Sequence, residues 1–436
     1  MIQEAFVRDR GVGRFARPRL VLIVGIAGLL WPSLSWAATD EPGTAAPAPV
    51  EAQSWTEWRG ATGDWGGLRT RLDERGLDVF AQYTTGFWSN TRGGFETGTR
   101  YEGFATWGFS VDLERLVRWP GGSFRMNWNS YHGGQPSEEL IGQYPTQALS
   151  GWEASTGVRF FEIAYSQRLW KQRVRIEIGQ LSSDGEFFQS ETSSLLLNAS
   201  FGFLGFARQV TPFYPLAAPG ALVSLRTRDA AWELRAAIYT AAPGEDERSN
   251  IGFDWAFGDG FTVFGEGIAR PKILGRRAAL SFGFLGVKSE VFDLSTGESV
   301  DGRVTLYGIA DWHVLEPSDA WPGVSVFLRI FGTPNTGVVL TDWYASGGFA
   351  ISRPFPGRES DALGFGFTVQ RFSDDYVALQ ATFGNDVSTR ESILEITYYA
   401  QVVGWLSLQP DLQVVLDPHF SRRNAVAVGL RGVIDF

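Results

Sequence analysis

Charged and amide side chains recur at every second position in several short stretches of this 436-residue chain. Such alternation places them together on one face of a β-strand. A guanidinium group can bind two neighbouring oxygen acceptors at once, and carboxylates and amides complement it. Because both signs are mixed at short spacing, the pattern favours a neutral polar solute over an ion. The candidate residues on these faces are Arg125, Asn127, Asn129, Glu162, Arg175, Glu177, Glu233, Arg235, Glu266 and Arg329.

The sequence offers little for catalysis, metal binding or nucleic-acid binding. It contains no cysteine, which excludes disulfides, thiolate metal sites and a cysteine nucleophile. Its three histidines lie outside recognisable catalytic motifs, so we expect no enzyme activity, no cofactor and no metal. The alternative is a hydrolase whose Ser–His or carboxylate pair meets only in the folded barrel. The net charge of −10 argues against a nucleic-acid partner, which needs a clustered basic face.

The N-terminus has the pattern of an export signal. An arginine-rich stretch precedes the apolar run 20–30, and small residues follow at Ala37 and Ala38, where we expect cleavage. Residues 1–38 are therefore predicted to be a signal peptide for Sec-type export. Residues 39–54 are rich in proline and alanine and are predicted to be a disordered linker. Every later apolar run is interrupted within a few residues, so the exported chain is either soluble or a β-barrel.

The elements that must position the candidate residues are β-strands. Aromatic residues make up 14% of the chain and there are 52 glycines, a composition that favours strands over helices. Val174, Ile176 and Ile178 alternate with Arg175 and Glu177, and the same pattern recurs in sixteen segments. The predicted strands are 77–88, 101–113, 123–131, 158–169, 173–181, 220–227, 232–240, 261–270, 277–288, 303–314, 323–332, 342–352, 361–372, 391–403, 406–417 and 424–436.

The gaps between these strands alternate in length, which separates a membrane barrel from a soluble sandwich. The gaps after the first, third, fifth and seventh strands are long, whereas those after the fourth, sixth and fourteenth contain two to four residues. Long external loops and short periplasmic turns are typical of outer-membrane barrels. The long gaps are 89–100, 132–157, 182–219 and 241–260. The segment 250–257 alternates poorly, and counting it would give an odd number of strands, so we do not predict a strand there.

The two ends of the predicted barrel also carry signals. The last strand alternates up to Phe436, and a C-terminal aromatic residue resembles the assembly signal that the barrel-assembly machinery recognises. Residues 55–76 contain a short helix that ends at Gly76, and we expect this segment to brace the barrel in the periplasm or to plug it. The fold prediction is all-β: residues 77–436 form a transmembrane antiparallel β-barrel, preceded by a short helical periplasmic segment.

Several motifs in a fixed order resemble the carbohydrate-selective porin (OprB) family. The resemblance runs from about residue 55 to residue 436 and is weakest over 240–300. The motifs lie at 58–76, 178–181, 186–190, 197–202, 212–220, 395–399, 409–414 and 424–431. The resemblance implies passive diffusion of monosaccharides and polyols through a sixteen-stranded barrel in the outer membrane of a Gram-negative bacterium.

The sequence is compatible with more than one transported solute and with more than one oligomeric state. Only Lys171, Lys272 and Lys288 among the 38 basic residues are lysines, and an arginine-rich constriction would favour small anions such as organic acids. The partners that we expect are sugars or polyols, outer-membrane lipid and the assembly machinery. The sequence leaves open whether three copies assemble as a homotrimer.

The longest gap, 182–219, is the candidate for narrowing the pore. It carries Glu186 and Arg208, and long ordered loops in large barrels often fold into the lumen. The gap 132–157, with Trp152, is expected to share this position. The alternative for the longer loop is an external lid.

We expect the constriction where this loop meets the third, fifth and seventh strands. Arg125, Arg175 and Arg235 lie on the polar faces of those strands, and each guanidinium fork matches two hydroxyl groups. The alternative is that the polar residues only form the wall of a water-filled lumen.

Overall fold

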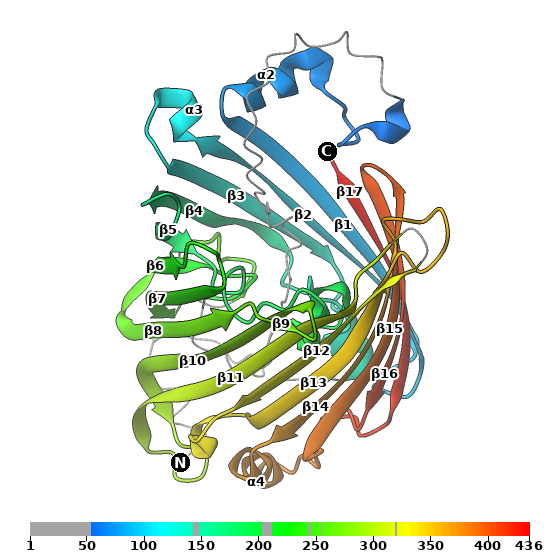
Figure 1. Ribbon diagram of the computed structural model, residues 1–436. Coiled ribbons are helices and arrows are strands. Elements are labelled where there is room, and N and C mark those ends of the chain that lie inside the picture. Colours follow the sequence, from blue (N-terminus) through cyan, green and yellow to red (C-terminus); the bar gives the residue numbers. More distant parts are fainter. Residues whose placement is uncertain (1–53, 143–147, 203–211, 243–245, 254, 319–320) are drawn as a thin grey trace.

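The computed structural model describes residues 54–142, 148–202, 212–242, 246–253, 255–318 and 321–436. Within these residues the chain forms a closed barrel of sixteen antiparallel strands (Figure 1). The barrel closes because β1 pairs with both β2 and β17. A two-residue strand, β9, only extends the turn before β10 and is not part of the wall. The predicted signal peptide, nearly all of the predicted linker and Arg208 lie outside the described residues.

The wall strands follow one another around the barrel in sequence order. They are β1 (Leu77–Arg92), β2 (Gly98–Asp112), β3 (Gly122–Gly133), β4 (Gly157–Leu169), β5 (Val174–Leu181), β6 (Ala218–Arg226), β7 (Trp232–Ala242), β8 (Ala256–Ala269), β10 (Arg276–Phe292), β11 (Ser299–Leu315), β12 (Gly323–Gly332), β13 (Thr341–Ser352), β14 (Ala362–Phe372), β15 (Arg390–Val403), β16 (Leu406–Leu416) and β17 (Ala425–Asp435). Each prediction of a strand is confirmed, with small shifts at the ends.

The helices are short and lie at the two ends of the barrel. The α-helices are α2 (Leu68–Glu74), α3 (Leu113–Val117) and α4 (Asp374–Thr382). Single helical turns are η1 (Trp55–Glu57), η2 (Trp65–Gly67), η3 (Ser137–Ile141), η4 (Ser193–Leu195), η5 (Ala199–Phe201) and η7 (Thr336–Val338), and β9 is Lys272–Ile273. No helix in the described part of the chain is long and apolar enough to cross a membrane.

The two faces of the wall differ in polarity as the alternation predicts. On β5, Ile176 and Ile178 point outward and are 37% and 57% exposed. Between them, Glu177 points inward and is 2% exposed, and Arg175 lies on the same inner face. An apolar outer belt around a polar interior is the arrangement of a transmembrane β-barrel. The inner face therefore carries the candidate residues.

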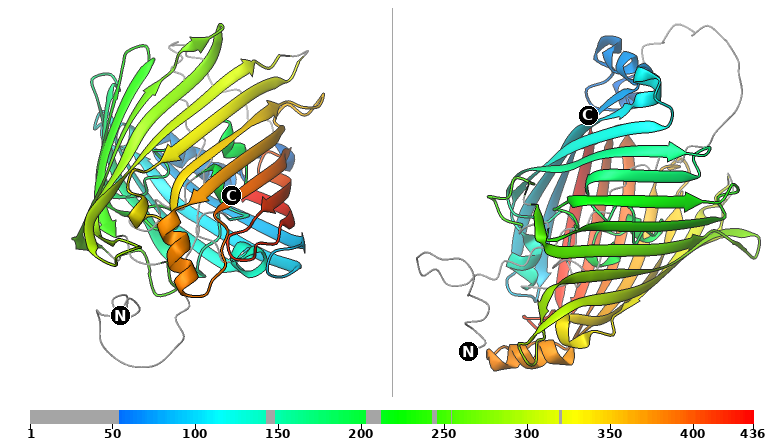
Figure 2. Two further views of the ribbon diagram at one scale, coloured as in Figure 1. Left: turned by 90° about the horizontal axis from the view of Figure 1, so that it is seen from below. Right: turned by 90° about the vertical axis from the view of Figure 1, so that its left-hand side faces the viewer.

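The two ends of the barrel are also different. Figures 1 and 2 show α2, α3 and the C-terminus at one end and α4 at the other. The end with α2 carries short turns, such as 170–173 between β4 and β5, whereas the opposite end carries the long loops 134–156 and 182–217. Short turns face the periplasm in bacterial outer-membrane barrels, so we assign the α2 end to the periplasm.

Several external gaps are shorter than the sequence predicts, as two examples show. β1 continues to Arg92 and β2 begins at Gly98, so the connecting loop is only 93–97 instead of 89–100. The extra ladder joins polar residues, including Ser89 opposite Thr99, and polar pairs give no amphipathic signal. Likewise β8 begins at Ala256, so its loop is 243–255 instead of 241–260.

The segment before β8 fills a gap in the wall. β5 ends at Leu181 and the chain turns into the lumen, which leaves the edge of β4 without a partner strand there. The backbone N–H of Phe160 on β4 donates to the carbonyl of Ile251 at 3.0 Å. Arg159 strengthens this contact by donating to the carbonyls of Asn250 and Glu247 at 3.1 and 3.0 Å. Residues 250–253 are thus a wall patch and Ala256 begins β8, so the structure shows no seventeenth wall strand in the described residues here.

Residues 55–76 lie against the periplasmic rim, next to the seam where β17 meets β1. The N–H of Ala61 donates to the carbonyl of Asp435 at 2.7 Å. The indole of Trp405 donates to the carbonyl of Trp55 at 3.0 Å, and the two rings are 5.8 Å apart. Helix α2 begins at Leu68 as the sequence predicts, and a glycine with φ 84° at position 76 follows its end. These contacts fix the segment to β17 and to the turn between β15 and β16.

Candidate functional site

The strand residues that the sequence singles out share the inner face of the barrel. Asn127, Asn129, Glu162, Glu177, Glu233, Glu266 and Arg329 are each less than 9% exposed, while apolar neighbours on the same strands point outward. Arg125, Arg175 and Arg235 are partly accessible, with 28%, 22% and 14% of their side-chain surfaces exposed. Three regions of the wall, on β3–β5, β7–β8 and β12, therefore carry the candidate groups on the inner face of the barrel.

The arginines and glutamates on β3, β4 and β5 form a continuous row of ion pairs. Arg125 lies between two carboxylates, with its Nε 3.4 Å from Glu162 and its Nη2 2.5 Å from Glu177. Glu177 also accepts a hydrogen bond from Arg175 at 3.0 Å. The charges alternate in sign along the row, so the wall is polar without a large excess of either sign.

Glu186 extends this row from the wall to the inward-folded loop. It accepts two hydrogen bonds from Arg175, one of them at 2.8 Å. Its carboxylate lies 3.9 Å from Arg235 on β7, which also donates to the backbone carbonyl of Glu186. Arg235 in turn contacts Glu233 at 2.8 Å and Glu266 at 3.8 Å. The loop is thus joined by charge to two wall strands that the sequence analysis placed beside it.

Glu233 and Glu266 are held by further partners at the edge of the network. Glu233 accepts from Arg226 at 3.0 Å and from Arg270 at 2.9 Å. Glu266 accepts from the hydroxyl of Tyr307 at 2.9 Å. The guanidinium forks that we expected to bind hydroxyl groups are therefore already occupied by carboxylates, and only their exposed edges face the lumen.

Arg329 has a different position from the other arginines. It is 0% exposed and lies beneath the loop. Its guanidinium donates to three backbone carbonyls, those of Phe188, Phe201 and Gly202. Arg329 therefore holds the loop in the lumen, and the structure does not bring it to the surface that a solute would touch.

The far wall fixes the loop through residues that the sequence analysis did not select as site residues. Asp311 on β11 accepts from Ser190 Oγ at 2.9 Å and from the N–H of Thr192 at 3.0 Å. Glu395 on β15 accepts from two consecutive backbone N–H groups, those of Leu197 and Asn198. Asp311 and Glu395 do belong to alternating polar faces, but their partners are far away in sequence. No local signal identifies such an anchor.

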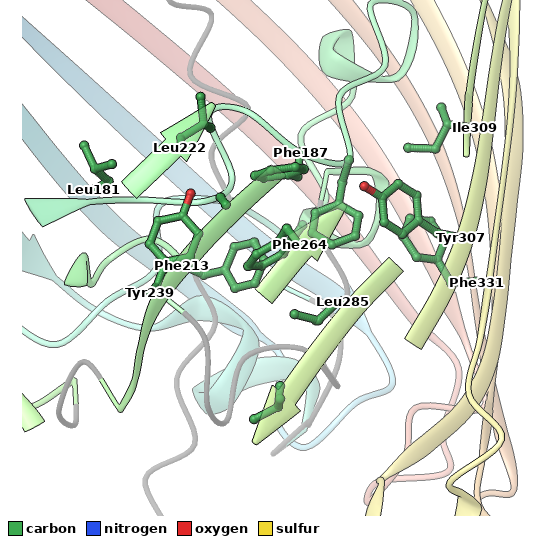
Figure 3. Packing of buried hydrophobic residues seen from close by; sticks show 14 of the residues in the cluster. Leu181, Phe187, Phe213, Leu222, Tyr239, Phe264, Leu285, Tyr307, Ile309 and Phe331 are labelled. Carbon is green, nitrogen blue, oxygen red and sulfur yellow. The ribbon is translucent and has the colours of Figure 1, made fainter. Parts of the chain in front are cut away.

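Aromatic packing fills the space between the loop and β8–β13. Figure 3 shows Phe187 and Phe213 of the loop beside Phe264 and Tyr307 of the wall. The rings of Phe187 and Phe264 stack with their centres 4.7 Å apart, and Phe188 lies 4.5 Å from Tyr307. Offset aromatic contacts of this kind add to the burial of apolar surface. The loop is a packed part of the lumen and not an external lid, which confirms the predicted inward fold.

The loop 134–156 shares this position, as the sequence predicts. The N–H of Ala199 donates to the carbonyl of Ala148 at 2.9 Å, which joins the two loops. Trp152 stacks on Phe104 of β2 with ring centres 4.4 Å apart. Residues 143–147 of this loop lie outside the described residues.

A small polar cavity remains beside the two loops. Its volume is about 40 Å³, enough for water molecules. Trp152, Gln189, Asn198 and Arg431 are among its lining residues, so an indole face lies near amide and guanidinium groups. Recognition of a sugar ring requires this combination of an apolar face with hydrogen-bonding groups. Among the described residues there is no cluster of histidine and acidic side chains suited to hold a metal ion.

A closed barrel with an apolar belt, a charged interior and an inward-folded loop defines the class of outer-membrane porins. The family model "Carbohydrate-selective porin, OprB family" matches residues 96–436, and the chain belongs to this family. Porin B of Pseudomonas aeruginosa is 23% identical over 427 residues, which cover 86% of this chain and 90% of that protein.

Solved structures show the same fold. The high-pH structure of Pseudomonas putida OprB has a TM-score of 0.80 at 21% identity, and the match covers 88% of this chain and all of that one. The low-pH structure of the same protein gives a TM-score of 0.57 at 18% identity over 87% of this chain and 99% of that one. The family and the fold place this chain in the outer membrane of a Gram-negative bacterium as a transport channel.

Proposed function

We propose that this chain lets monosaccharides and polyols diffuse passively across the outer membrane, through a lumen narrowed by the loop 182–217. The observation that carries the proposal is the neutralised row of charges on which this loop rests. Every arginine of the row contacts at least one carboxylate, so the described residues of the row do not present charges of a single sign to the passage. The exposed edges of these arginine–carboxylate pairs offer hydrogen bonds to sugar hydroxyls, and they attract neither cations nor anions strongly.

The rival cargo is a small organic anion. An anion would be favoured by guanidinium groups without partners, whereas Arg125, Arg175 and Arg235 are each shared between carboxylates. We also infer that the chain is not an enzyme, because the carboxylates of the row are engaged in structural contacts with arginines. For transport itself we expect weak binding, because a pore that retains its solute stops conducting.

Liposome swelling tests the proposal directly. Liposomes containing the purified protein should swell quickly in glucose and glycerol, more slowly in disaccharides, and slowly in organic acids of similar size. Protein-free liposomes give the baseline for each solute. Faster entry of gluconate or another organic acid than of glucose would reject the neutral-sugar proposal in favour of the anion channel.

A further inference from the structure

A large apolar recess lies on the outside of the barrel, away from the lumen and its charges. It has a volume of about 620 Å³, within the range of small-molecule sites. Its lining includes Trp65 of the N-terminal segment, Ala81, Trp107 and Trp128 on β1–β3, and the terminal Phe436. The lining is almost entirely apolar, which suits a hydrocarbon chain and not a sugar.

The recess opens on the face of the barrel that meets lipid. Ala81 pairs with Trp107, and Val79 pairs with Phe109, on the face opposite the inward Thr84 and Thr106. The same outward face carries Phe87, which is 50% exposed. The recess lies at the α2 end of these strands, so it adjoins the acyl chains of the periplasmic leaflet.

A cationic group borders this recess. The guanidinium of Arg69 lies 5.4 Å from the ring centre of Trp65, and its Nη2 approaches the carbonyl of Val79 at 3.4 Å. Its Nη1 is buried, and no described residue accepts a hydrogen bond from it. Arg71 on helix α2 and Arg75, which directly follows it, are exposed. Arg69 as a whole is partly exposed, so its other N–H groups can donate to a phosphate, which offers the oxygen acceptors that a guanidinium needs.

We propose that this recess is a phospholipid site, in which one acyl chain occupies the apolar space and the phosphate binds Arg69. The occupant comes from the periplasmic leaflet, which touches the open side of the recess. Both parts of the site belong together chemically, because a phospholipid carries a hydrocarbon chain next to a phosphate.

The position of the site gives the lipid a structural role. Its walls come from the N-terminal segment, from the first three strands and from the last residue of the chain. The N–H of Phe436 donates to the carbonyl of Ala81 at 2.8 Å, so the recess exists only when the barrel has closed. Gly60 completes the arrangement, since a Cβ there would lie within 3 Å of both Arg69 Nη1 and Phe436. A bound lipid therefore stabilises the seam after assembly.

Native mass spectrometry of the full-length mature protein, released from mild detergent, tests the site. Phosphatidylethanolamine, phosphatidylglycerol and diacylglycerol are each added at equal concentration. The wild type should retain one molecule of either phospholipid and about tenfold less diacylglycerol, which lacks the phosphate. Arg69→Gln should remove this preference.

Two variants and a matched control locate the acyl chain. Ala81→Phe fills the recess and should lower phospholipid retention at least tenfold, whereas Ala345→Phe, outward-facing on β13 and outside the recess, should leave it unchanged. Trp65→Ala removes the large apolar lining residue that the N-terminal segment contributes, and it tests the site if Ala81→Phe fails to assemble, because it should also lower retention. Equal retention by the recess variants and Ala345→Phe, or no retained phospholipid in the wild type, would overturn the proposal. Equal retention of diacylglycerol would overturn the role of Arg69.

Discussion

At the scale of single residues, the constriction of the lumen is lined by a network of ion pairs rather than by independent sugar-binding side chains. Glu186 is its central member, because it is the carboxylate that the loop contributes to Arg175 and Arg235. Removing one partner of a buried ion pair leaves the other charge uncompensated. Each substitution in the row is therefore expected to change the charge that the lumen presents, not only its width.

Replacing Glu186 by glutamine should make the channel anion-selective. The substitution keeps the size of the side chain but leaves Arg175 and Arg235 with excess positive charge next to the passage. A change of about 1 kcal/mol in the barrier for an ion corresponds to about a fivefold change in rate. We expect the chloride-to-potassium permeability ratio, measured as a reversal potential in planar bilayers, to rise by about this factor.

Glu191→Gln is the matched control for that measurement. Glu191 lies on the same loop, its side chain is 71% exposed, and it contacts His313 at 3.4 Å. If Glu186→Gln and Glu191→Gln give the same reversal potential as the wild type, the row of charges does not border the conducting path.

The residue types on the inner face were predictable, but their pairing was not. Period-two alternation is a local property of each strand, so it identifies Arg125 and Glu177 as inward-facing from sequence alone. Which carboxylate meets which guanidinium depends on register between strands and on the path of a long loop. Arg329 illustrates the difference: its inward position was predicted, while its contacts with loop carbonyls depend on residues more than 120 positions away.

At the scale of elements, the loop 182–217 keeps its place through polar anchors on opposite walls. Arg329 on β12 supplies three hydrogen bonds to carbonyls of this loop. Each buried acceptor that loses its donor costs about 1–3 kcal/mol. Hydrophobic packing around Phe187 and Phe188 remains when the guanidinium is removed, so the loop should loosen without leaving the lumen.

Arg329→Met should therefore increase the local mobility of the loop. We expect amide hydrogen exchange in residues 186–202 to become at least tenfold faster, and single-channel currents to become noisier. Arg277→Met, which removes an exposed periplasmic pair with Glu316, serves as the control. Unchanged exchange in the loop of Arg329→Met would show that the aromatic cluster alone holds it.

A second element-scale prediction concerns the external loops around His419, which lies between β16 and β17. The ring is buried against Phe372 and Tyr376, and its Nδ1 lies 3.1 Å from the carbonyl of Ser388. Burial lowers the pKa of His419 to about 4, from an ordinary value near 6.5. The nearby Glu391 accepts from the backbone N–H of His419 and not from its ring.

The lowered pKa makes the contact between these loops sensitive to acid. Because the folded form favours the neutral ring, its stability is complete above about pH 6.5 and falls as pH decreases toward 4. The full effect is about 3 kcal/mol on local opening. We expect hydrogen exchange in residues 373–389 to accelerate from pH 7 to pH 5, after correction for intrinsic rates. His419→Phe should remove this dependence, and an unchanged pH profile in that variant would contradict it.

At the scale of the whole molecule, strand number and topology were predictable because a barrel repeats one simple rule. Alternating faces and alternating gap lengths gave the sixteen strands. Loop lengths were less accurate, because the β1–β2 hairpin continues through pairs such as Ser89 opposite Thr99, which give no amphipathic signal. The patch at Ile251 could not be predicted, since it exists only because β5 ends early and exposes the edge of β4.

A closed barrel makes a simple prediction for the purified mature protein. Its circular dichroism spectrum in detergent should be dominated by β-structure, and its mobility on gels should change on boiling, because the sixteen strands close into a barrel. A mainly helical spectrum would contradict the fold.

Replacing Phe436 by serine should reduce the amount of assembled barrel without changing transport per assembled molecule. The N–H of Phe436 pairs with Ala81 across the seam, and its ring lines the outer recess far from the charged lumen. The measurement is the heat-modifiable fraction in outer membranes, followed by swelling rates normalised to that fraction. Phe367→Ser is the matched control, because Phe367 is also outward-facing, is 40% exposed and lies within β14. Both variants place one polar group on the lipid face. If closure depends on the seam, only Phe436→Ser should strongly reduce the amount of assembled barrel. Equal abundance of the two variants would show that a polar group at the lipid surface, and not the chain terminus, determines assembly.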